Sequence, residues 1–165
     1  MILYVARHAW AGNFGDPGCS DDTLRELTPD GIERYFRTVD ALVEQRGFTP
    51  DRLATSPYTR CVQTATIIAE RTPKAPEFDK IEALGCGVDL PQLMAWTAEH
   101  ESAGDLCWVG HNPDVEALVA WLVGSPVGVV SFAKGSVAAV EFAAGPVEKG
   151  AGELLWHCTA KSLGV

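Results

Sequence analysis

The stretch that decides the fold is Ile2-Leu3-Tyr4-Val5-Ala6-Arg7-His8, in a chain of 165 residues. Its five successive apolar or aromatic residues predict a strand that is buried on both faces, as in the middle of a parallel sheet. The run ends directly in Arg7 and His8. Open α/β sheets bind their ligands at the carboxyl ends of such strands, so we expect Arg7 and His8 to lie in a crevice.

Length and composition predict one globular domain over residues 1–165. Hydrophobic residues make up 47% of the chain and charged residues 21%, an ordinary balance for a globular protein. The net charge of −9 argues against nucleic acid and anionic membranes as general partners. Five widely spaced cysteines without a C-x-x-C pair indicate reduced thiols and a cytoplasmic location.

Strand and helix patterns alternate along most of the chain, which predicts an α/β fold with helices on both faces of the sheet. The helix expected from Tyr58 to Arg71 has an apolar side of Val62, Ala65 and Ala69, with Ile68 adjoining. Further helices are expected at about 28–46, 90–100 and 115–122. Further strands are expected at 52–56, weakly at 78–81, and at 105–111, 136–142 and 153–158.

Three local signals concern the ends of helices and the connection before the first one. Thr28-Pro29-Asp30 predicts a helix start, with threonine as N-cap and proline at the first helical position. Asn112-Pro113-Asp114 predicts a second cap. The segment 9–27 is longer than most loops in compact domains, which favours a functional role for it.

Polar residues follow three of the expected strands. His8 and His111 each end a strand, and Arg60 lies one turn into the helix after the strand that ends at Ser56. If these strands are parallel neighbours, the two histidines meet Arg7 and Arg60 at one edge of the sheet. Two guanidiniums and two imidazoles suit a tetrahedral dianion, because arginine binds two oxygens at once and stays charged. Each residue alone would more often be structural, but four together make that interpretation weaker.

Several blocks together resemble the histidine phosphatase superfamily, also called phosphoglycerate mutase-like. Its signature is similar to Arg7-His8 after a hydrophobic strand. The blocks similar to its "LT-x-x-G", "SP-x-x-R-x-x-QTA" and second histidine motifs are Leu27-Thr28-Pro29-Asp30-Gly31, Thr55-Ser56-Pro57-Tyr58-Thr59-Arg60-Cys61-Val62-Gln63-Thr64-Ala65 and Val109-Gly110-His111-Asn112-Pro113. The short chain and the segment Lys134-Gly135-Ser136 are most similar to SixA-type phosphohistidine phosphatases. One departure is Ala9, where the broad superfamily has glycine.

The resemblance implies a three-layer α/β/α sandwich with a mostly parallel central sheet and no large cap insertion. It implies that His8 is the nucleophile and becomes phosphorylated, and that Arg7, Arg60 and a protonated His111 hold the phosphoryl group. His8 must then attack as neutral imidazole, and nearby arginine charges lower its pKa. No cofactor or metal is expected, because the arginines supply the positive charge.

The resemblance also implies an acidic residue that protonates the leaving group. The matching segment contains Glu82, which alone would more often be a surface carboxylate. Asp16 and Asp21 in the long loop 9–27 are rival candidates.

Three functions remain open from the sequence. The first is a phosphatase that acts on phosphohistidine in a protein partner, since a chain without a cap leaves an open site. The second is a small-molecule phosphomonoesterase or mutase. The third is a phospholigand-binding module without turnover, against which the complete set of four pocket residues argues. In each case phosphate, sulfate or vanadate is an expected ligand of the site.

Overall fold

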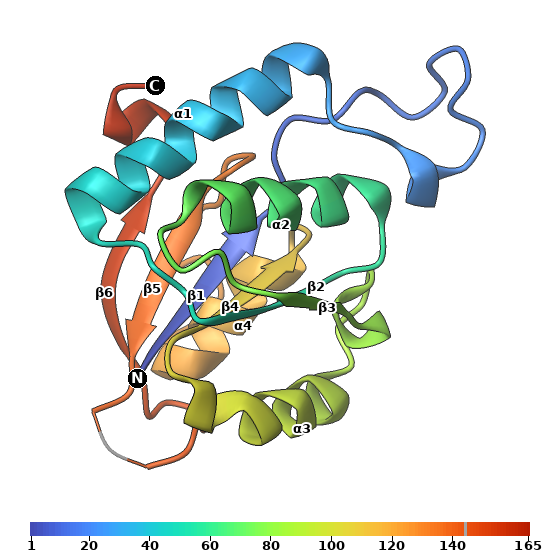
Figure 1. Ribbon diagram of the computed structural model, residues 1–165. Helices are drawn as coiled ribbons and strands as arrows, with labels where there is room; N and C mark the ends of the chain where they lie inside the picture. The colour runs from blue at the N-terminus through green and yellow to red at the C-terminus, as the bar shows by residue number, and fades with distance from the viewer. Residues whose placement is uncertain (144) are drawn as a thin grey trace.

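The computed structural model describes residues 1–143 and 145–165, and the strands within these residues form one sheet (Figure 1). The strand order is β3-β2-β4-β1-β5-β6. Neighbouring strands among β1 to β4 run parallel, and β5 and β6 are added antiparallel at one side. The predicted mostly parallel sheet is therefore confirmed. The bounds are Ile2–Arg7 for β1, Arg52–Thr55 for β2, Phe78–Lys80 for β3, Leu106–Gly110 for β4, Val137–Glu141 for β5 and Glu153–Cys158 for β6.

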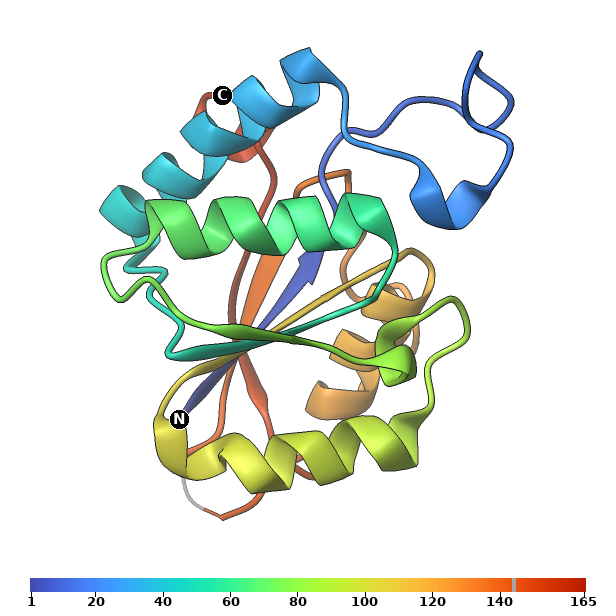
Figure 2. The same cartoon turned by 45° about the vertical axis from the view of Figure 1, so that its right-hand side comes forward.

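Helices cover both faces of this sheet, as the alternating pattern predicted. In Figure 2, α1 and α2 lie on one side of the sheet and α3 and α4 on the other. Each side has its own hydrophobic core. The bounds are Pro29–Arg46 for α1, Thr59–Arg71 for α2, Leu90–His100 for α3 and Asp114–Val123 for α4. Single-turn helices lie at Asp22–Leu24 (η1), Glu82–Leu84 (η2), Glu101–Ala103 (η3) and Lys161–Leu163 (η4).

Strand β1 lies between β4 and β5 and contributes side chains to both hydrophobic cores. Leu3 and Val5 are fully buried in the core under α3 and α4. Tyr4 and Ala6 belong to the core under α1 and α2. Successive strand residues point to opposite faces, so an unbroken apolar run is what a strand covered on both sides requires.

The helix start at Thr28 is confirmed, because its hydroxyl accepts a hydrogen bond from the Gly31 amide at 3.0 Å. The cap predicted at Asn112-Pro113-Asp114 is wrong, because α4 begins after Pro113 without a hydrogen bond from a capping side chain. The Asn112 amide instead donates to Glu116 at 2.8 Å, and the Asp114 carboxylate accepts from the Gly87 amide at 2.9 Å. Both side chains are taken by other partners.

The buried side of α2 also differs from the prediction. Val62 and Ala69 are only half-buried, whereas Cys61 and Thr64 are fully buried. The Thr64 hydroxyl donates to the Arg60 carbonyl at 2.7 Å and accepts from the Ala9 amide at 3.0 Å. Because both hydrogen-bonding functions of the hydroxyl are satisfied, a polar residue can occupy the core and the helix is rotated from its simplest apolar stripe.

The structure also bears on the state of the cysteines and on whether a helix could cross a membrane. The five cysteines are free. Within residues 1–143 and 145–165, none of the helices combines the length and the apolar composition that crossing a bilayer requires.

Candidate active site

The backbone of Arg7 and His8 is fixed from both sides of β1. The His8 amide donates to the Gly110 carbonyl at the end of β4 at 3.0 Å. The His8 carbonyl accepts from the Gly135 amide, and the Arg7 amide donates to the Ser136 carbonyl, both at 3.0 Å. Gly135 has φ of +74°, and a Cβ there would lie 3.0 Å from the Trp10 ring. This position therefore needs glycine for both its conformation and its space.

The structure brings the four predicted residues together at the carboxyl edge of the parallel strands. The rings of His8 and His111 have centroids 5.5 Å apart. Arg60 Nη2 lies 3.3 Å from His111 Nδ1, and the charges of both arginines act on His8. The side chains are shielded from solvent, with His8 at 5% exposed and Arg60 and His111 at 3%. Sequence patterns alone correctly indicated this juxtaposition.

The His8 imidazole is arranged as a nucleophile. Its Nδ1 lies 2.8 Å from the Ala9 carbonyl oxygen, which can only accept, so Nδ1 carries the proton and Nε2 keeps its lone pair. Burial lowers the pKa of His8 to about 3, and the charges of Arg60 and Arg7 add to the effect. The pKa of His8 is lowered, as expected, but burial contributes more to the shift than the arginine charges do. His8 is therefore neutral at pH 7.

His111 is also neutral in this structure, whereas the expected imidazolium concerns the ring beside a bound phosphoryl group. Its Nδ1 faces Arg60, which can only donate, so Nε2 carries the proton and donates to Ser56 Oγ at 2.8 Å. Burial lowers the pKa of His111 to about 4, with the Arg60 charge as the next cause. The sequence argument did not consider how burial would lower the pKa of His111. A dianion beside the ring would favour protonation, so the charged form belongs to the occupied site.

Both arginines keep a free donor at the site. Arg7 Nη1 donates to the Phe132 carbonyl at 2.6 Å. Arg60 donates from Nη1 to the Asp22 carbonyl at 2.7 Å and from Nη2 to the Asp22 carboxylate at 3.1 Å. The Nε atoms of both arginines are buried and have no hydrogen-bond partner in the described part of the chain. Buried unpaired donors are costly, and a tetrahedral anion would satisfy both.

Sequence reasoning missed two acidic residues around the site. Asp22 contacts Arg60, although only its neighbour Asp21 was considered. Glu116 accepts from the Phe132 amide at 2.8 Å, and the Phe132 carbonyl in turn holds Arg7. Nothing in the sequence distinguishes Asp22 from other loop carboxylates, and Glu116 has the pattern of an ordinary first-turn residue of a helix.

The structure separates the three candidates for the leaving-group acid. Asp16 accepts from the Asn13 amide at 2.8 Å, and Asp21 accepts from the Thr23 amide at 2.9 Å, so both serve turns within the loop. Glu82 is exposed and lines an open cavity of about 280 Å³ beside Tyr58. The Tyr58 ring packs against His111 with centroids 4.9 Å apart. The cavity therefore adjoins the phosphate pocket.

The positive charge at this site comes from Arg7 and Arg60. Across residues 1–143 and 145–165, the structure contains no group of three or more His, Cys, Asp and Glu side chains with the geometry to hold a metal ion.

No protein-family model matches the sequence, and a search of curated proteins finds no match. Among solved structures, the chain is similar to the protein histidine phosphatase SixA complexed with tungstate, with a TM-score of 0.82, 22% identity and 99% of each chain covered. The fold is that of the histidine phosphatases. A structure assigned as a SixA phosphohistidine phosphatase from Agrobacterium tumefaciens has a TM-score of 0.76 and 20% identity, covering 96% of this chain and 97% of that one.

The histidine phosphatase fold also occurs in enzymes with other names. A phosphoserine phosphatase from Entamoeba histolytica, solved with 3-phosphoglyceric acid, has a TM-score of 0.65 and 18% identity. The match covers 98% of this chain and 98% of that one. The 99% coverage in both directions against SixA means that neither chain has a large insertion relative to the other. The short, uncapped sandwich predicted from the sequence is confirmed.

Proposed function

We propose that the protein is a phosphatase that works through a phosphohistidine intermediate on His8. The observation that carries the proposal is a neutral His8, with its Nε2 lone pair free, beside two guanidiniums whose buried Nε donors have no partner within residues 1–143 and 145–165. Such a pocket is preorganised for a tetrahedral anion next to a nucleophile. The tungstate of the similar SixA structure, a tetrahedral oxyanion, supports this assignment.

The reaction has two steps. His8 Nε2 attacks phosphorus while the bond between phosphorus and the leaving group breaks. The proton of His8 stays on Nδ1, which donates a hydrogen bond to the Ala9 carbonyl. Water then attacks the phosphorylated His8 and releases inorganic phosphate. In both transition states, negative charge spreads over three equatorial oxygens. Arg7, Arg60 and His111 can meet this charge, the last after it takes up a proton from solvent as the anion binds.

Phosphohistidine on a protein partner is the substrate that we propose. An imidazole leaves readily when its other ring nitrogen carries a proton, so this substrate needs little from an acid. The chain has no large insertion relative to a structure named protein histidine phosphatase, which supports access for a partner protein. We also propose a cytoplasmic location and independence of metal, supported by the free cysteines and by the arginine charges.

A small phosphomonoester is the second candidate, because the open cavity at Tyr58 and Glu82 offers room for a small leaving group. The activity of the enzyme on a protein that carries phosphohistidine, compared with sugar phosphates, phosphoserine and an aryl phosphate, separates the candidates. We expect the largest kcat/KM on phosphohistidine. A clear preference for one small phosphomonoester would establish the second candidate instead.

A rapid-quench experiment tests the intermediate. We expect acid-labile, alkali-stable label on His8 of the wild type, and none in His8→Ala. Retained activity in His8→Ala would contradict the mechanism, and binding of phosphate without turnover of any substrate would indicate a binding module. Activity that disappears with EDTA and returns with a divalent ion would overturn metal independence.

A further inference from the structure

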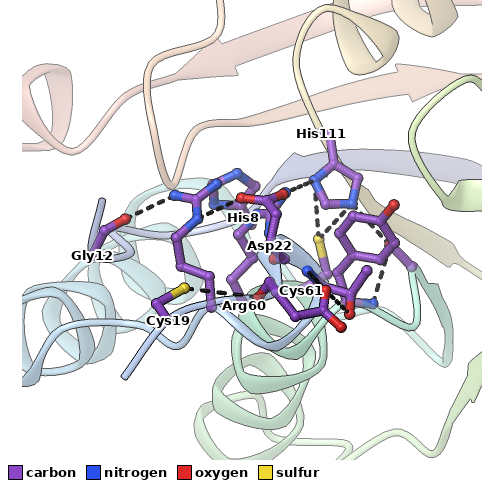
Figure 3. A network of polar contacts seen from close by, with 12 residues as sticks. His8, Gly12, Cys19, Asp22, Arg60, Cys61 and His111 are labelled. Atoms are coloured by element: carbon purple, nitrogen blue, oxygen red, sulfur yellow. Dashed lines mark hydrogen bonds and ion pairs between the residues drawn. The ribbon is translucent and has the colours of Figure 1, made fainter. Parts of the chain in front are cut away.

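Arg60 reaches the site from the first turn of α2, but its orientation is set by η1 in the loop 9–27. Its two Nη groups donate to Asp22, to the carbonyl at 2.7 Å and to the carboxylate at 3.1 Å. Figure 3 shows Asp22 beside Arg60 and His111. Asp22 takes one N–H of Nη1 and one of Nη2, and Nη2 also contacts His111, so the Nε–H and the second N–H of Nη1 remain for an anion. Of these, Nε is buried and has no partner among the residues that the structure describes.

Asp22 is itself held in place by the loop. Arg25 Nε donates to the second carboxylate oxygen of Asp22 at 2.9 Å, and Arg25 Nη1 donates to the Gly12 carbonyl at 2.8 Å. The Gly12 amide donates to the Glu26 carbonyl at 3.2 Å, so the two arms of the loop are joined at this point. The carboxylate therefore bridges two arginines and has little freedom to rotate.

We infer that Asp22 is a positioning residue, which fixes the Arg60 guanidinium so that its remaining N–H groups face the phosphoryl group on its way to His8. The inference rests on the proposed function. It differs from a role in proton transfer, because Asp22 donates nothing to the substrate and acts through Arg60. It also assigns a task to the long loop 9–27, which neither the fold nor the four pocket residues explain.

Two other roles for Asp22 fit the structure less well. Burial acts to raise its pKa, but the hydrogen bonds and charges of Arg25 and Arg60 outweigh it and lower the pKa, so Asp22 has no proton to give at pH 7. An internal anion that competes with phosphate would have to move away when substrate binds. The main-chain carbonyl of Asp22 holds Arg60 as well, and it cannot leave without moving η1.

Asp22→Asn tests the inference, with Asp21→Asn as the matched control. An amide oxygen accepts from only one of the two arginines and turns an NH₂ group toward the other, so Asp22→Asn loosens Arg60. We expect a loss in kcat/KM of roughly tenfold to a hundredfold, with a parallel loss in orthovanadate affinity, because small misplacements of a catalytic group cost up to about 10²-fold. Asp21→Asn removes the same charge but keeps the cap on Thr23, and is expected to behave as wild type.

A double-mutant comparison separates positioning from a general structural role. If Asp22 acts through Arg60, Asp22→Asn adds nothing to the loss caused by Arg60→Ala. Additive losses would contradict the inference, as would an Asp22→Asn protein with unchanged kinetics. Tighter binding of phosphate by Asp22→Asn would make Asp22 a competitor and overturn the positioning role.

Calorimetric affinities for phosphate and vanadate give a readout that needs no turnover. If the protein proves to be a binding module, the proposed function fails. A loss of vanadate affinity in Asp22→Asn that is absent in Asp21→Asn would then still support the positioning of Arg60. Equal affinities in wild type and both variants would contradict that positioning, whatever the activity.

Discussion

Arg7 and Arg60 have the same task at the pocket but are held by different parts of the molecule. Arg7 extends from the central strand, and its guanidinium is bound by the Phe132 carbonyl, which is tied through the Phe132 amide to Glu116 in α4. Arg60 is bound by Asp22, whose side chain is 40% exposed in a loop. The Arg7 guanidinium therefore depends on a carbonyl that α4 holds in place, whereas the Arg60 guanidinium depends on a half-exposed carboxylate.

The difference implies two kinds of sensitivity. Removing Glu116, the support of Arg7, leaves the Phe132 amide and the Asn112 side-chain amide without this acceptor, so stability and activity should fall together. Removing the support of Arg60 breaks a contact made by a half-exposed carboxylate, so activity should fall with little loss of stability. Local contacts near solvent contribute little to the free energy of unfolding, yet they can set catalytic geometry.

Removal of either guanidinium is expected to produce the largest effect. Arg7→Ala and Arg60→Ala should each lower kcat by about 10² to 10³, or roughly 3–4 kcal/mol in activation free energy, as for other preorganised donors. Orthovanadate, which can adopt a trigonal-bipyramidal shape, should inhibit the wild type at far lower concentration than phosphate, and lose that advantage in both variants. A loss of only a few-fold in Arg60→Ala would contradict its role at the transition state.

Glu116→Ala should show the coupled loss predicted for the Arg7 side. Glu116 Oε1 accepts from both the Phe132 amide and the Asn112 side chain at 2.8 Å. Without it, two hydrogen bonds are lost, at about 1 kcal/mol each, and the carbonyl that binds Arg7 is released. We expect the free energy of unfolding to fall by about 2 kcal/mol in urea titrations, with a loss of roughly tenfold in kcat/KM.

Glu116→Gln is the matched variant for this prediction. A glutamine retains the single oxygen that accepts both hydrogen bonds, so most of the stability and activity should return. If Glu116→Ala loses activity without stability, as Asp22→Asn is expected to do, the contrast between the two supports is wrong.

The comparison also shows where sequence reasoning succeeds. The run from Ile2 to His8 combines burial on both faces with a polar end, so the placement of Arg7 and His8 follows from one strand. His111 follows from the same logic applied to β4. The four residues meet because β2, β4 and β1 are adjacent parallel strands, an order that the sequence argument assumed as a condition and that the alternation of strands and helices does not specify. The threonine cap of α1 is a purely local signal and was equally predictable.

The failures concern interactions between distant parts of the chain. The contact of Asp22 with Arg60 joins residues 38 positions apart, and no spacing rule separates Asp22 from Asp16 or Asp21. The rotation of α2 depends on a hydroxyl partner, Ala9, that lies 55 positions away. The neutral His111 of the ligand-free protein was not predicted either way, because it depends on burial, which the pattern of charges does not report.

The pH dependence of the two imidazoles should show the effect of that burial. The pKa values of His8 and His111 are lowered to about 3 and about 4 from an ordinary 6.5. Neither ring should gain a proton between pH 8 and 5 in ligand-free protein, as followed by NMR of the ring carbon-bound protons. Bound phosphate should raise the pKa of His111. Titration of either ring near pH 6.5 without ligand would contradict these environments.

The same shifts predict how stability changes with pH. A histidine whose pKa is lower in the folded state binds its proton more readily in the unfolded chain. Stability is therefore complete above about pH 6.5, and is lost as pH falls toward the folded values of about 4 and about 3. Replacing His111 with Asn should reduce this acid sensitivity in thermal unfolding between pH 7 and 5. An unchanged pH dependence would assign the acid sensitivity to other groups.

Glu82 is expected to have the smallest effect on the proposed substrate. It lines the cavity beside Tyr58, whose ring also contacts Arg60 at 5.1 Å from the guanidinium carbon to the ring centroid. An alkoxide leaves poorly and must be protonated as its bond breaks, whereas an imidazole can already carry a proton on its other nitrogen. We propose Glu82 as the acid for alkoxide leaving groups. Glu82→Gln should then barely change kcat/KM on phosphohistidine but strongly lower it on an alkyl phosphate.

The measurement is kcat/KM on both substrates in wild type and Glu82→Gln, with Glu99→Gln as a control that removes a carboxylate from the neighbouring cavity along α3. Equal large losses on both substrates would mean that Glu82 binds substrate or shapes the pocket. No loss on either would exclude Glu82 as the acid. Asp16 and Asp21 are engaged in the loop and Asp22 is held ionised between two arginines, so none of these three would replace it, and the leaving group would take its proton from water. An enzyme of that kind is restricted to leaving groups as good as imidazole, which would itself select phosphohistidine over the phosphomonoesters.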